Sequence, residues 1–111
     1  MSEDELLAAI RKMIKRAEEP KLAKKFADYS KSLMMSFEDT GLDITVIFEN
    51  GIGMVERGSI ENPVMKVITD SKTILDILNG DLSAMRAFMS GKIKADGPAR
   101  DLMKLQHLLK S

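Results

Sequence analysis

The sequence predicts an α+β fold in which helices at both ends of the chain cover one face of a central β-sheet. Near both ends, apolar residues recur at every third or fourth position, which is typical of amphipathic helices. In the middle of the chain they alternate with polar residues, which is typical of strands with one buried face. At 111 residues, the chain is expected to form a single domain over residues 1–111.

The first helix is predicted over roughly residues 3–17, because Ser2 and Glu5 have the spacing of a capping box. Its apolar stripe consists of Leu6, Ile10, Met13, Ile14 and Ala17. Pro20 suits the first turn of a second, short helix. The apolar side of that helix consists of Leu22, Phe26 and Tyr29.

The period then changes from that of a helix to that of a strand. Two alternating runs follow, with inward residues Leu33, Met35 and Phe37 in the first and Leu42, Ile44, Val46 and Phe48 in the second. Asp43, Thr45 and Glu49 are expected on the opposite face of the sheet. Asn50-Gly51 then favours a type I′ hairpin turn, since this turn needs positive φ at both central residues. A third strand is predicted from about Ile52 to Arg57.

A loop marked by Gly58 and Asn62-Pro63 leads to a fourth strand with Met65, Val67 and Thr69. Asp70 or Ser71 can cap the next helix, which carries Ile74, Ile77 and Leu78.

Gly80 and Gly91 are placed to end two successive helices, since glycine accepts the left-handed conformation of a helix C-cap. Asp81 can cap the second of them, and its apolar face is predicted to consist of Leu82, Met85, Phe88 and Met89. A short strand is expected from Lys92 to Ala95. Gly97-Pro98 then starts a final helix with Leu102, Leu105 and Leu109 on one side, and Met103 nearby.

Composition excludes several classes of function. The 17 basic residues balance 17 acidic ones, and there are no cysteines, so disulfides, thiolate zinc sites and a cysteine nucleophile are excluded. His107 is the single histidine, and the residues show neither metal-ligand spacing nor a nucleophile with a partnered base. We expect no enzymatic activity, metal or cofactor. The acidic N-terminus does not resemble a secretory signal, no stretch approaches the ~20 apolar residues of a transmembrane helix, and we expect a cytoplasmic protein.

Basic residues are concentrated near the N-terminus although the chain is neutral overall. A transient contact with an anionic membrane surface is one interpretation of this segment, and an ordinary solvated helix face is the other. The residues concerned are Lys12, Lys15, Arg16, Lys21, Lys24 and Lys25. Nucleic-acid binding is not expected, because aromatic residues do not interleave with the basic ones.

The second half of the chain resembles the sterol carrier protein type 2 family. The pattern begins with Asn50-Gly51 and a strand, continues with a helix that ends at Asn79-Gly80, and closes with a helix containing Lys104-Leu105-Gln106. Its most specific part is the segment Ala87-Phe88-Met89-Ser90-Gly91-Lys92-Ile93-Lys94-Ala95-Asp96-Gly97. Unlike many eukaryotic members, the chain ends in Leu109-Lys110-Ser111 rather than a peroxisomal tripeptide.

The resemblance implies a five-stranded, largely antiparallel sheet covered by helices, with an apolar cavity between the two layers. It also implies binding or transfer of a fatty acid, acyl-CoA, phospholipid or isoprenoid-like lipid without chemistry, by a monomer or homodimer. The cavity is expected to measure ~300–1,000 Å³. Its expected lining consists of Leu33, Met35, Phe37, Ile44, Val46, Phe48, Met54, Ile74, Leu78, Met85, Phe88, Met89, Leu102, Met103 and Leu105.

Nine methionines suit a deformable pocket and a loosely packed core equally well. A second hypothesis therefore stays open, in which the same fold serves as an interaction or regulatory domain without a physiological lipid.

Overall fold

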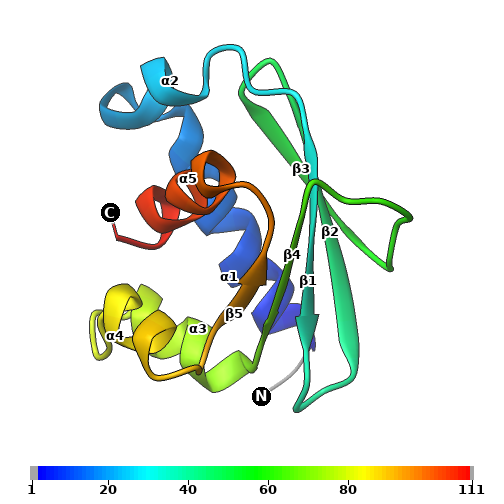
Figure 1. Ribbon diagram of the computed structural model, residues 1–111, viewed down its shortest axis with the longest axis vertical. Coiled ribbons are helices and arrows are strands. Elements are labelled where there is room, and N and C mark those ends of the chain that lie inside the picture. Colours follow the sequence, from blue (N-terminus) through cyan, green and yellow to red (C-terminus); the bar gives the residue numbers. More distant parts are fainter. Residues whose placement is uncertain (1–2, 111) are drawn as a thin grey trace.

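The computed structural model describes residues 3–110 and confirms the α+β fold (Figure 1). In chain order, the elements are α1 (Glu3–Lys15), a 3-10 helix η1 (Arg16–Glu18), α2 (Pro20–Phe26), β1 (Ser32–Phe37), β2 (Leu42–Glu49), β3 (Ile52–Arg57), β4 (Met65–Thr69), α3 (Ser71–Leu78), α4 (Ala84–Met89), β5 (Lys94–Asp96) and α5 (Ala99–Lys110).

The five strands form one mixed sheet in the order β3-β2-β1-β4-β5. The central pair, β1 and β4, is parallel, whereas the other three pairings are antiparallel. After β3, which forms one edge of the sheet, the chain crosses over β2 and β1. It then adds β4 on the far side of β1. Figure 1 shows the helices on one side of this sheet, which leaves its other face without a helical layer.

The register of the sheet confirms the predicted inward face. Leu33 is opposite Val46 and Met35 is opposite Ile44 in the β1–β2 pair. Six inward side chains are each at most 2% exposed, namely Leu33, Met35, Phe37, Ile44, Val46 and Phe48. Thr45 points to the opposite face as predicted, yet it is buried because the loop after β3 covers it and its hydroxyl donates to the Gly58 carbonyl at 2.7 Å.

Helix α5 holds the helical layer together. It contacts α1, α2, α3 and α4, and its buried face contributes Leu105, Leu108 and Leu109 to the core. The guanidinium of Arg16 donates to the Leu108 carbonyl at 2.8 Å. The last helix therefore joins elements from both halves of the chain.

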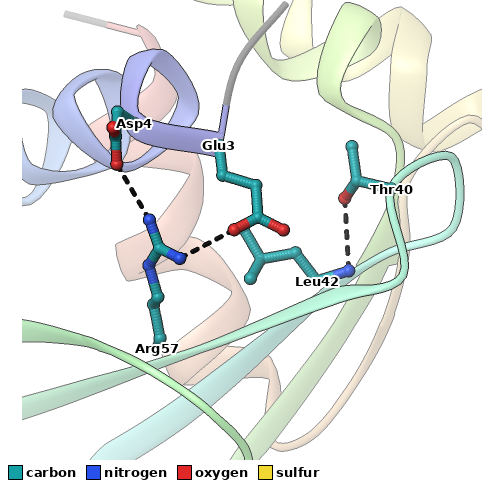
Figure 2. A network of polar contacts seen from close by, with 5 residues as sticks. All are labelled: Glu3, Asp4, Thr40, Leu42 and Arg57. Carbon is teal, nitrogen blue, oxygen red and sulfur yellow. Dashed lines mark hydrogen bonds and ion pairs between the residues drawn. The ribbon is translucent and has the colours of Figure 1, made fainter.

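A pair of ion pairs attaches the start of α1 to the edge of the sheet. Figure 2 shows Arg57 of β3 between Glu3 and Asp4, with N–O distances of 2.7 and 2.8 Å. In the same view, Thr40 accepts a hydrogen bond from the Leu42 amide in the turn between β1 and β2. Since Arg57 is half exposed, we expect its ion pairs to orient the helix more than they stabilise it.

Two predicted turn and cap features are confirmed. Asn50 and Gly51 have φ of 50° and 85°, as a type I′ turn requires. Asp70 caps α3, since its carboxylate accepts from the Thr73 amide at 2.8 Å. The predicted capping box at Ser2 lies outside the described residues.

The prediction for the helix after Gly80 is wrong in two respects. Ser83, not Asp81, is the N-cap, because its side chain accepts from the Arg86 amide. The helix starts two residues later than an Asp81 cap would place it, and its buried residues are Ala84 and Ala87. The small alanines face the core, Leu82 and Phe88 are partly buried against it, and Met85 and Met89 lie on the surface.

Two element boundaries also differ from those predicted. The first helix ends at Lys15 and tightens into η1 before Pro20. The last strand begins at Lys94 rather than Lys92, because the Lys92 and Ile93 amides donate to the Ala87 carbonyl of α4 instead of to a neighbouring strand. Ile93 nevertheless points inward and is 2% exposed.

Candidate functional site

More than half of the predicted lining residues form the packed core between the sheet and the helices. The six inward strand residues, Ile74 and Leu105 are each at most 2% exposed. Leu78, Phe88 and Leu102 are partly buried and pack against this core. These residues therefore come together between the two layers, where they pack against one another as core.

Four predicted lining residues lie on the surface instead. Met85, Met89 and Met103 are 52%, 81% and 58% exposed, and Met54 is 58% exposed. Met85 and Met89 belong to α4 and Met103 to α5, whereas Met54 lies on the edge strand β3. The structure thus separates Met54 from the other three.

An apolar depression of about 310 Å³ lies between α4 and α5. It is lined by Phe88, Ala99, Leu102, Met103 and Gln106, so a single polar side chain contributes to its walls. Three of these residues, Phe88, Leu102 and Met103, are among those predicted to line a ligand cavity. The volume is at the lower end of the ~300–1,000 Å³ typical of ligand sites.

A second hollow, of about 260 Å³, lies on the other side of α5 and is strongly basic. Its lining comprises Lys24, Lys25, Asp28, Tyr29, Lys31, Arg100 and Lys104. Five of these seven side chains carry a positive charge at neutral pH. Helix α5 therefore separates an apolar hollow from a cationic one.

A buried carboxylate anchors the basic hollow to the fold. Asp101 is 0% exposed, and its Oδ1 accepts a hydrogen bond of 2.5 Å from the Tyr29 hydroxyl. The Lys31 ammonium is 3.5 Å from the same oxygen, and Oδ2 has no hydrogen-bond partner among the described residues. Burial, together with the bond to Asp101 and its negative charge, raises the pKa of Tyr29.

Lysine side chains also lie close to the aromatic rings beside α5 and to the single histidine of that helix. The Lys104 ammonium lies 5.2 and 5.1 Å from the ring centroids of Phe26 and Tyr29, within the range of cation–π attraction. Lys25 Nζ is 3.1 Å from His107 Nε2. Burial lowers the pKa of His107, and the positive charges of Lys25, Lys110 and Lys104 lower it further.

Sequence reasoning missed Ala99 and Gln106 of the apolar depression, Arg100 of the basic hollow, and the buried Asp101 that accepts a hydrogen bond from Tyr29. One available signal was Asp101, the single acidic residue in an otherwise basic final helix. A carboxylate in the first turn of a helix interacts favourably with the helix dipole. Its pairing with Tyr29, 72 positions away, follows only from the tertiary structure.

A larger hollow, of about 460 Å³, lies elsewhere, at the edge of β3. Its lining mixes Arg11, Lys15 and Glu18 with Ile52, Gly53, Met54 and Val55. Because both signs of charge meet there, this hollow is a poorer match for an apolar ligand than the smaller depression beside α5.

The fold and the core define the chain as an α+β domain of the sterol-carrier type. The chain belongs to the SCP-2 sterol transfer family, whose model matches residues 10–110. No curated protein sequence gives a significant match.

Solved structures agree with this family. A palmitated sterol carrier protein 2-like protein from Aedes aegypti is 19% identical, with a TM-score of 0.76 and coverage of 100% of this chain and 96% of that one. The ubiquinone synthesis protein UbiJ-SCP2 is 14% identical, with a TM-score of 0.72 and coverage of 96% and 94%. At these identities, the likeness concerns the fold alone.

A third similar structure is an enzyme, the inverting sec-alkylsulfatase Pisa1 from a Pseudomonas species. It is 27% identical over 79% of this chain, with a TM-score of 0.67. The chain spans 14% of the length of that sulfatase.

Two other kinds of site are not found in the described part of the chain. No helix within residues 3–110 is long and apolar enough to span a membrane. The same residues contain no cluster of three or more histidine, cysteine or acidic side chains that could hold a metal ion.

Proposed function

We propose that this protein binds an apolar, chain-bearing lipid non-enzymatically, with the chain of the lipid in the depression between α4 and α5. The candidate ligands are a fatty acid, an acyl-CoA, a phospholipid or an isoprenoid-like lipid. The observation that carries the proposal is the apolar lining of that depression in a member of a sterol transfer family. The palmitated state of the similar mosquito protein supports a ligand of this class.

Binding energy at such a site comes mainly from removing the lipid chain from water, at about 0.8 kcal/mol per methylene. The exposed methionines favour this role, because a flexible thioether side chain adapts to chains of different shape. Deeper entry between the layers requires Phe88 and Leu102 to move, since both pack against the buried core.

We expect saturable binding of fluorescent fatty acids that strengthens roughly ten-fold for each added two-carbon unit until the site is full. Met103→Trp fills space in the depression without adding charge and should weaken binding. Met54→Trp is the matched control, because Met54 has the same exposed fraction of 58% on a different face. Thermal unfolding of each variant excludes loss of the fold as the cause.

Two results would contradict this proposal in different ways. Absence of saturable binding by the unmodified protein would argue against a lipid carrier and favour an interaction domain, a role consistent with the tight packing of the sheet residues. Binding that Met103→Trp leaves unchanged, or that Met54→Trp weakens equally, would place the ligand elsewhere.

A further inference from the structure

The outer edge of β3 presents backbone hydrogen-bonding groups that have no strand beside them. β3 is the last strand on its side of the sheet and pairs with β2 alone. The two-residue turn at Asn50-Gly51 makes Glu49 and Ile52 a hydrogen-bonded pair, and such pairs alternate with non-bonded ones along an antiparallel ladder. Gly53 and Val55 therefore direct their amides and carbonyls away from β2.

A contact across this edge agrees with that orientation. The guanidinium of Arg11 in α1 donates to the Val55 carbonyl at 3.5 Å, a long contact that a backbone amide at normal distance could replace. At the other edge of the sheet, β5 spans three residues, whereas β3 spans six. β3 is therefore the longer of the two outermost strands, and a long edge is a template for an added strand.

The face of β3 that points away from the helices is apolar near the turn. A Cβ on Gly53 would meet the Ile14 side chain of α1, so Gly53 faces the helices. Ile52 and Met54, one position to either side, therefore face the helix-free side of the sheet. They are 57% and 58% exposed, and they are two of the five large apolar side chains that are exposed within residues 3–110.

The helical side of the same edge carries an excess of positive charge. The hollow of about 460 Å³ beside β3 is lined by Arg11, Lys15 and Glu18, whose side chains are all exposed. The acidic residues at the start of α1 lie near the other end of β3, where they contact Arg57. A strand placed along the first half of β3 would therefore meet two cations and one carboxylate on this side.

We propose that the β3 edge binds an extended segment of a partner protein in which acidic and apolar residues alternate. Backbone bonds to Gly53 and Val55 supply affinity, and the alternate side chains supply specificity, as in other cases of strand addition. The acidic side chains of the segment point toward Arg11 and Lys15, and the apolar ones cover Met54. This edge is separate from the α4–α5 depression, so the proposal does not depend on lipid binding.

A second copy of this chain is a poorer occupant of the edge. A two-fold axis between two β3 edges would bring Arg11 and Lys15 of both copies to the same seam. Each copy would bring a single carboxylate, Glu18, to that hollow for its two cations, and like charges at close range repel. An acidic segment of another protein removes this repulsion and pairs the cations instead.

The test is fluorescence anisotropy of a labelled peptide with the sequence Val-Glu-Val-Glu-Val-Glu. We expect saturable binding that weakens as salt screens the charges. Val-Lys-Val-Lys-Val-Lys, which has the wrong charge, and Val-Val-Val-Glu-Glu-Glu, which does not alternate, should bind little. Amide hydrogen exchange measured by NMR gives an independent readout, because exchange at Gly53 and Val55 should slow when the glutamate peptide is bound.

Charge reversal on α1 tests the helical side of the edge. The double variant Arg11→Glu with Lys15→Glu should bind the alternating glutamate peptide roughly tenfold more weakly, and it should bind the lysine peptide more tightly than the unmodified protein does. Lys21→Glu with Lys24→Glu makes the same change in net charge on α2. This control should leave both affinities nearly unchanged.

A methionine substitution tests the helix-free side of the edge. Met54→Glu should weaken binding of the glutamate peptide several-fold, because a carboxylate replaces an apolar contact. Met89→Glu makes the same change at another exposed methionine, on α4, and should have no effect. All the substituted side chains are exposed, so the fold should be retained, and circular dichroism of each variant checks this.

Several outcomes would overturn the proposal. They are absence of binding by the glutamate peptide, equal binding of all three peptides, unchanged amide exchange at Gly53 and Val55, and equal loss of affinity in a variant and its control. Protection of the same amides in a dimer without peptide would show that a second copy occupies the edge, and it would also contradict the proposal. Fatty-acid titration tests the proposed function separately, so each idea can fail alone.

Discussion

Replacing Gly51 with alanine should lower the free energy of unfolding by about 2–5 kcal/mol. Two penalties add at this position. Gly51 has φ of +85°, a conformation that costs an L-residue roughly 1–2 kcal/mol. A Cβ there would also be 2.5 Å from the Phe26 carbonyl oxygen, and backbone at the end of α2 cannot yield as the tip of a side chain does. The turn would have to move away from α2.

Gly80→Ala is the matched control for this experiment. Gly80 has φ of +84°, but a Cβ there would meet no atom within 4 Å. It should therefore show the conformational penalty alone, about 1–2 kcal/mol. Urea denaturation of both variants measures the difference. Equal losses would mean that the contact between the β2–β3 turn and α2 is looser than the structure indicates.

Replacing Tyr29 with phenylalanine should lower the free energy of unfolding by about 2–3 kcal/mol at neutral pH. The substitution removes the hydrogen bond to Asp101 and leaves a buried carboxylate with only Lys31 near it. The ring contacts with Phe26 and Phe48 are retained, so the lost free energy of unfolding measures the contribution of the hydroxyl. A free energy of unfolding that is unchanged within error would show that water or Lys31 satisfies the Asp101 carboxylate without the Tyr29 hydroxyl.

Burial of Tyr29, together with its hydrogen bond to Asp101, should also make the protein sensitive to alkali. The pKa of Tyr29 is raised in the folded state, so the folded protein holds this proton more tightly than the unfolded chain does. The resulting stability is fully present below pH ~10, the unfolded pKa of tyrosine, and is lost as pH rises further, by up to about 1.4 kcal/mol per unit.

Two measurements can isolate this effect. Tyr29 is the single tyrosine and the chain has no tryptophan, so tyrosinate absorbance titrates this residue alone. The lysines titrate in a similar range, so Tyr29→Phe serves as the reference for urea denaturation at several alkaline pH values. If the two proteins lose stability in parallel above pH ~10, the raised pKa of Tyr29 does not contribute.

Local patterns predicted most of the fold. The alternation from Leu33 to Phe48 assigned the inward face of β1 and β2 correctly, because a strand has two faces and a shift of one residue would bury Asp43 or Glu49. Asn50-Gly51 predicted its turn because few residue pairs tolerate that backbone. The parallel pairing of β1 with β4 came from no local signal, since it joins strands separated by a whole hairpin.

Such patterns predicted less of the candidate site than of the fold. Apolar periodicity identifies the residues that leave water, but it does not distinguish Leu105 in the packed core from Met103 beside a depression. In α4, the pattern put Met85 and Met89 on the buried face, whereas both are exposed and the fully buried residues are Ala84 and Ala87. The basic hollow depends on residues from α2, the following loop and α5, which only the tertiary structure brings together.

The position of α5 also has a consequence for the order in which the protein folds. This helix contributes buried leucines to the core, and its contacts with Arg16 and Tyr29 join residues 92 and 72 positions apart. Contacts between such distant segments form slowly, because a long loop must close before they form. During synthesis at about 5–20 residues per second, the apolar faces of α1 and the sheet would remain partly uncovered for several seconds until α5 has been made. Over that interval the nascent chain would be a substrate for chaperones and prone to aggregation.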